Sequence, residues 1–130
     1  MGTEPITLIN SARKDLQMVT KLLNEYERSR DVGVLTSIAK LGLLIFDNAT
    51  KALLDAREIR VKDWGYVMEV IRYFVPNNVV SEDLRDYFVK CSSQNNGCDH
   101  DEVPARVNEL SRFVDYISTV VTHRIPYRGL

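Results

Sequence analysis

The chain has almost no excess of charge of either sign, and this absence narrows its function. Its 130 residues carry 17 Lys and Arg against 18 Asp and Glu, a formal net charge of −1. A surface balanced in this way exerts no bulk attraction on nucleic acid or on anionic membranes. The length and the apolar fraction of 45% are typical of one globular domain with one core, which we expect to span residues 1–130.

Long apolar runs and export signals are also missing. The longest strongly apolar run, Leu41 to Phe46, is far shorter than the roughly 20 residues that cross a bilayer. The N-terminal residues lack the basic segment and apolar core of a secretory signal. We therefore expect an intracellular, cytoplasmic protein without a membrane anchor.

Few residues are of the kinds that build catalytic or cofactor sites. The six glycines are scattered and form no phosphate-binding loop. The two histidines, His100 and His123, belong to no Glu-x-x-His motif, which a di-iron bundle requires. The acidic residues fit polar helix faces, and no pair of carboxylates stands out for hydrolysis. We predict a non-catalytic protein with no cofactor and no metal.

The stretch CSSQNNGCDHDE, residues 91–102, holds both cysteines and admits three interpretations. Zinc sites usually pair cysteines two to four residues apart, whereas six residues separate Cys91 from Cys98 and there is no second pair. A disulfide between Cys91 and Cys98 would suit an oxidising compartment or a hyperthermophile's cytosol. In the interpretation that we prefer, Cys91 is a buried apolar residue, Cys98 is an ordinary thiol, and Asn96-Gly97 forms a tight turn.

Apolar residues recur at steps of three and four along most of the chain, which predicts helices. The predicted helices cover about residues 6–28 and 34–56, a shorter one from Trp64 to Phe74, a fourth that Ser81 caps, and a last one from about Pro104 to just before Pro126. We therefore predict an all-α fold, an antiparallel bundle of three long and two short helices.

The second of these helices is apolar around nearly its whole circumference. Small residues such as Gly42 and Ala49 mark the seam where a neighbouring helix approaches closely. Its remaining apolar side chains exceed what one seam buries, unless the short third and fourth helices cover them. We therefore predict protein association, most simply as a homodimer, with Leu43, Phe46 and Leu54 at the interface.

The C-terminal tail suggests an alternative function. His123, Arg124, Tyr127 and Arg128 combine cations with a ring that can stack on a base. The alternative hypothesis is a nucleic-acid-associated protein that acts through this tail.

The order of the segments resembles the HEPN domains. The resemblance covers residues 11–74 and is carried by SARKDLQMVTKLLNEYE, by GVLTSIAKLGLLIFDNATKALLDA and by WGYVMEVIRYF. It implies a helical bundle that dimerises, often as the partner of a nucleotidyltransferase. Many members are metal-independent ribonucleases that carry an Arg, then four to six arbitrary residues, then a His. Here Arg85 and Arg112 stand farther than that from His100 and His123, so no catalytic residue is carried over.

Overall fold

The computed structural model describes residues 4–93 and 97–123, and over these residues every secondary-structure element is a helix. Three helices are long, α1 (Pro5–Ser29), α2 (Val32–Ala56) and α5 (Val103–His123), and two are short, α3 (Val67–Ile71) and α4 (Leu84–Ser92). Two 3-10 turns, η1 (Trp64–Tyr66) and η2 (His100–Glu102), precede α3 and α5. The predicted all-α bundle of three long and two short helices is confirmed.

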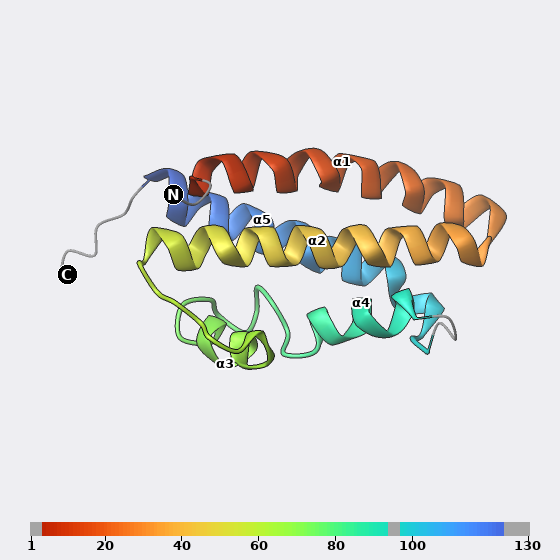
Figure 1. The fold of residues 1–130 in the computed structure, drawn as a ribbon. Helices are drawn as coiled ribbons and strands as arrows, with labels where there is room; N and C mark the ends of the chain where they lie inside the picture. Colours follow the sequence, from red (N-terminus) through yellow and green to blue (C-terminus); the bar gives the residue numbers. More distant parts are fainter. Residues whose placement is uncertain (1–3, 94–96, 124–130) are drawn as a thin grey trace.

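The helices run up and down in turn (Figure 1). Helices α1 and α2 form an antiparallel hairpin, and α5 lies along both of them. Helices α3 and α4 follow one another along the opposite side of α2 from α1, where a four-helix bundle would have one long helix. Helix α2 packs on α1, α4 and α5, which makes it the central helix of the fold.

The α1–α2 connection is short because the local sequence ends one helix and starts the next at once. Arg30 adopts a left-handed conformation with φ of 56°, and its N–H donates to the carbonyl of Tyr26. Asp31 then caps α2, its carboxylate accepting from the N–H of Gly33 at 2.8 Å. This cap starts α2 two residues before the Val34 that we predicted.

The helices between α2 and α5 are shorter than the sequence pattern predicts. Helix α3 ends at Ile71, so Phe74 lies in the turns that follow it and not in the helix. We predicted Ser81 as the N-cap of α4, but Asp83 occupies that position. The reason is that the Ser81 hydroxyl is engaged elsewhere, with the side chains of Asp83 and Arg106, each at 3.0 Å.

One hydrophobic core extends from Ile9 in α1 to Val121 in α5. At its centre the rings of Phe46 and Phe113 stack with their centroids 4.8 Å apart. Helix α4 reaches the core through Phe88, which packs directly on Gly42 of α2. A Cβ atom added at Gly42 would lie 2.9 Å from two carbons of the Phe88 ring. The close approach expected at the small residues of α2 is therefore present at Gly42.

We predict that Gly42→Ala destabilises the fold even though alanine favours helices. Overpacking a core costs about 1–3 kcal/mol, and the gain in helix propensity returns at most about 1 kcal/mol. Urea denaturation should show a net loss of stability for Gly42→Ala in the wild-type background. The loss should shrink in a Phe88→Leu background, where the ring is gone. Equal losses in both backgrounds would mean that Phe88 does not set the limit at Gly42.

Candidate functional site

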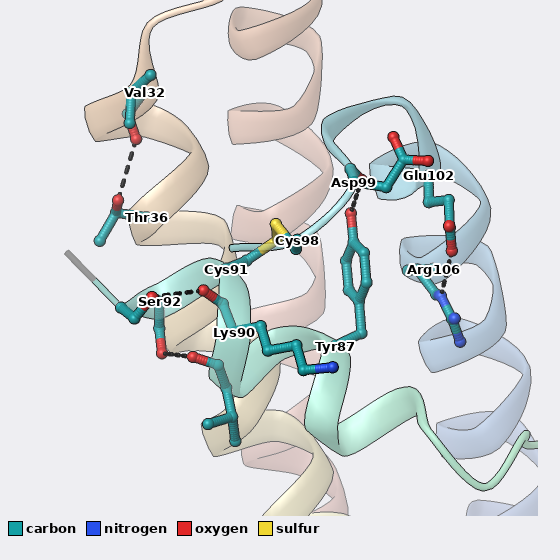
Figure 2. Close-up of a disulfide and its surroundings, with 12 residues drawn as sticks. Val32, Thr36, Tyr87, Lys90, Cys91, Ser92, Cys98, Asp99, Glu102 and Arg106 are labelled. Carbon is teal, nitrogen blue, oxygen red and sulfur yellow. Dashed lines mark hydrogen bonds and ion pairs between the residues drawn. A yellow bond between two sulfur atoms is a disulfide. The ribbon is translucent and has the colours of Figure 1, made fainter. Parts of the chain in front are cut away.

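The structure joins Cys91 and Cys98 in a disulfide at the corner where α4 leads toward α5 (Figure 2). Cys91 is 1% exposed at the end of α4, and Cys98 is partly buried in the segment that precedes η2. Their Cα atoms are 5.0 Å apart, within the range that disulfides span. Our preferred interpretation, two separate thiols, is therefore wrong, because Cys98 lies against the end of α4 and is bonded to Cys91. The burial of Cys91 was predicted correctly.

Tyr87 connects this disulfide to the rest of the corner. Its hydroxyl donates to the carbonyl oxygen of Asp99, the residue next to Cys98, at 2.7 Å (Figure 2). The guanidinium of Arg106 lies 5.0 Å from the centre of the Tyr87 ring, a cation–π distance. Burial and the nearby carboxylate of Glu102 raise the pKa of Tyr87, which keeps its hydroxyl protonated as a donor.

Arg106 is the electrostatic centre of the corner. Its side chain, 14% exposed, contacts the carboxylates of Asp83 at 2.9 Å, Glu102 at 3.1 Å and Glu109 at 3.3 Å. Glu109 in turn accepts from the backbone N–H of Ser81. Hydrogen bonding to Arg106 lowers the pKa of Asp83, and the same bond raises the pKa of Arg106. These contacts fasten the start of α4 to the first turns of α5.

The contacts at this corner stabilise the fold. The carboxylates around Arg106 are used as its partners, and the two sulfur atoms are bonded to each other. Within the described residues no group of three or more His, Cys, Asp and Glu side chains is placed to hold a metal ion. His100 lies in η2 before α5, whereas His123 ends α5, about 30 Å away at the 1.5 Å rise of a helix. Within one chain the backbones of the two histidines are therefore far apart.

A second polar network sets the alignment of α2 and α4. Asp47 of α2 accepts from the indole N–H of Trp64 at 3.1 Å and from Nε of Arg85 in α4 at 3.0 Å. All three groups are partly buried between the helices. Asp47 and Arg85 therefore mark the level at which α2 and α4 face each other.

The three residues that we predicted at an interface differ in how far they are exposed to solvent. Phe46 is completely buried and Leu54 is 4% exposed, so neither presents a surface to a partner, and the prediction is wrong for both. The reason is that α4 and α5 cover the side of α2 that the sequence pattern left open. Leu43 is half-buried at the edge of the core. Its neighbour Leu44, which we did not single out, is 48% exposed.

Val89 of α4 is a further exposed apolar side chain, 40% exposed. Leu43 precedes Asp47 by one helical turn, and Val89 follows Arg85 by one turn. Because α2 and α4 are antiparallel, both steps lead the same way from the Asp47–Arg85 pair (Figure 1). Leu43 and Val89 therefore lie at a similar level along the two helices. We call these two residues, together with the exposed Leu44 next to Leu43, the α2/α4 face.

The predicted nucleic-acid tail falls almost wholly outside the described residues. His123 is the last residue of α5, and the backbone there lies at the end of the bundle away from the disulfide (Figure 1). Arg124, Tyr127 and Arg128 lie outside the described residues. The tail stays a prediction.

Helix α2 is long and apolar enough, by length and composition alone, to cross a membrane. In this structure it packs on α1, α4 and α5, and much of its apolar surface forms the core. The same composition suits the central helix of a globular bundle, because such a helix is buried on several sides.

These features define an all-α bundle with a disulfide-closed corner and a small exposed apolar face. Comparison with family models, with curated proteins and with solved structures found no match to this chain. The resemblance to HEPN domains stays a prediction.

Proposed function

We propose that this protein is a non-catalytic helical bundle that acts by protein association, as a homodimer formed through the α2/α4 face. The observation that carries the proposal is the exposure of two large apolar side chains, Leu44 and Val89, on helices that pack together. Leu43, the residue before Leu44, is half-buried and packs against the core. Isolated apolar side chains are common on surfaces, whereas neighbouring ones on two packed helices suit an interface.

A second copy of this chain is the partner that the charges favour. The formal net charge of −1 gives little repulsion between two copies. A face that lies on two antiparallel helices can pair with itself about a twofold axis, which is the commonest symmetry of homo-oligomers. Three side chains cover less than the roughly 800 Å² per partner of a standard interface. We therefore expect a concentration-dependent dimer with a dissociation constant on the order of micromolar.

Sedimentation velocity on three proteins tests the proposal. The wild type should shift from monomer to dimer over about 1–100 μM, as a micromolar dissociation constant requires. The double variant Leu44→Glu/Val89→Glu should stay monomeric, because it would place charges in the apolar centre of the interface. Both residues are exposed in the monomer, so circular dichroism should remain that of the wild type.

Met18→Glu is the matched control. Met18 is 49% exposed on α1, a helix that contributes no residue to the α2/α4 face, and its substitution adds one carboxylate to an equally exposed apolar site. It should dimerise as the wild type does. A wild type that remains monomeric at 100 μM, about a hundred times the expected constant, would refute the proposal. Dissociation by Met18→Glu but not by the double variant would place the interface on α1.

A further inference from the structure

We propose that the Cys91–Cys98 disulfide is a redox-sensitive latch that holds the C-terminal end of α4 and thereby regulates association through the α2/α4 face. The regulatory part rests on the proposed function, because Val89 lies on α4 two residues before Cys91. The latch itself rests only on the contacts of the corner.

The exposure of the two sulfur-bearing residues indicates where a reductant attacks. Cys91 is 1% exposed in the core, so its sulfur is closed to an external thiol. Cys98 is only partly buried and lies between two exposed residues, Gly97 and Asp99. Thiol–disulfide exchange requires direct access to the sulfur under attack. The reaction therefore begins at Cys98.

The reductant is a dithiol. One of its thiolates attacks Sγ of Cys98, the S–S bond breaks, and the sulfur of Cys91 leaves with the electron pair and takes up a proton. The second thiol of the reductant then displaces the sulfur of Cys98, which leaves as a thiol. The protein disulfide gains two electrons and two protons, and the dithiol becomes a disulfide.

The contacts around the disulfide carry this change into α4. Cys98 holds Asp99 in place, and the carbonyl of Asp99 accepts the hydrogen bond from Tyr87, in the middle of α4 (Figure 2). The Gly97 N–H also donates to the carbonyl of Lys90, at 3.1 Å, near the end of α4. Once the bond between the sulfurs is broken, both contacts must be held without the covalent link between Cys91 and Cys98. The end of α4 then opens more often.

The remainder of α4 keeps its own anchors. Phe88 on Gly42 and Arg85 on Asp47 hold it to α2 independently of the disulfide. Reduction therefore loosens the end of α4 and leaves the bundle folded. Val89, between these anchors and Cys91, lies in the part that loosens.

Amide hydrogen exchange of the wild type with and without a phosphine reductant tests the latch directly. Amides near the end of α4, from about Val89 to Ser92, should exchange about tenfold faster or more after reduction, while those of α1 remain unchanged. In Cys98→Ser, which keeps Cys91 in the core, the same amides should exchange fast whether or not the reductant is present. Equal exchange of α4 in the oxidised and reduced wild type would overturn the latch.

Sedimentation velocity on the same samples tests the regulation. The reduced wild type should dimerise about fivefold more weakly or worse, within the usual range of coupling between two sites. Faster exchange in α4 with an unchanged dissociation constant would overturn the regulation. If the oxidised protein does not dimerise, the proposed function and its regulation fail together, whereas the exchange rates still decide the latch.

Discussion

Phe46→Ala should lower the free energy of unfolding by about 3–5 kcal/mol, the usual cost of removing a buried phenylalanine. Phe46 is completely buried on α2, and its ring stacks on Phe113 of α5. Truncation removes this stack and leaves a cavity between α2 and α5. Urea denaturation followed by circular dichroism measures the loss.

The control for Phe46→Ala is Leu44→Ala, two residues earlier on the same helix. Leu44 is exposed, so truncation creates no cavity, and we expect a change within about 0.5–1 kcal/mol. The pair of variants also separates core from interface. If Phe46→Ala left the stability unchanged and only broke a dimer, Phe46 would be an interface residue and its position in the core would be wrong.

Arg106→Met should cost about 2–3 kcal/mol. Removing one partner of a buried ion pair usually costs about 3–5 kcal/mol, because the charge left behind has no counter-ion. The expected value is lower here because the Asp83 carboxylate, whose side chain is 62% exposed, is hydrated once Arg106 is removed. Glu109, 11% exposed, keeps its hydrogen bond from the Ser81 N–H but loses its counter-ion in a poorly hydrated position, and this accounts for most of the loss. Urea denaturation at neutral pH measures it.

Lys90→Met is the matched control for Arg106→Met. Lys90 pairs with Asp86 on the exposed side of α4, at 3.2 Å, and such pairs contribute only about 0.3–0.5 kcal/mol. Similar losses in the two variants would show that the Arg106 cluster is no stronger than a surface ion pair.

The pH dependence gives Arg106→Met a second test. The hydrogen bond to Arg106 lowers the pKa of Asp83 below the ordinary value of 3.8. A lowered folded-state pKa adds stability at pH values above about 4, and this contribution disappears as the pH falls through the folded-state pKa. The stability difference between wild type and Arg106→Met should therefore narrow below about pH 4. A difference that widens in acid would contradict the assignment.

The long helices could be predicted from the sequence because their apolar spacing is local information. The stripe from Ile9 to Tyr26 needs only a helix with one buried side, and α1 has that form. The buried side of α2 could not be predicted in the same way. Whether Phe46 or Leu44 meets solvent depends on where α4 and α5 pack, and the spacing along α2 contains no information about either helix.

The polar corner illustrates the same limit. Part of the Arg106 cluster could be predicted from the sequence, because Glu102 and Glu109 stand four residues before and three residues after Arg106 on one helical face. Asp83 joins them from a different helix, and only the fold brings it there. The disulfide was one of three interpretations of residues 91–102. The choice among them required the position of Cys98 relative to the end of α4.

Native mass spectrometry of unreduced wild-type protein, purified without chelator, tests the central claim most directly. The account predicts a concentration-dependent dimer without bound metal, in which each chain is lighter than its fully reduced mass by two hydrogen atoms, as one disulfide requires. A monomer at every concentration would contradict association through the α2/α4 face. A monomer with bound zinc and both thiols reduced would contradict the structure of the corner as well.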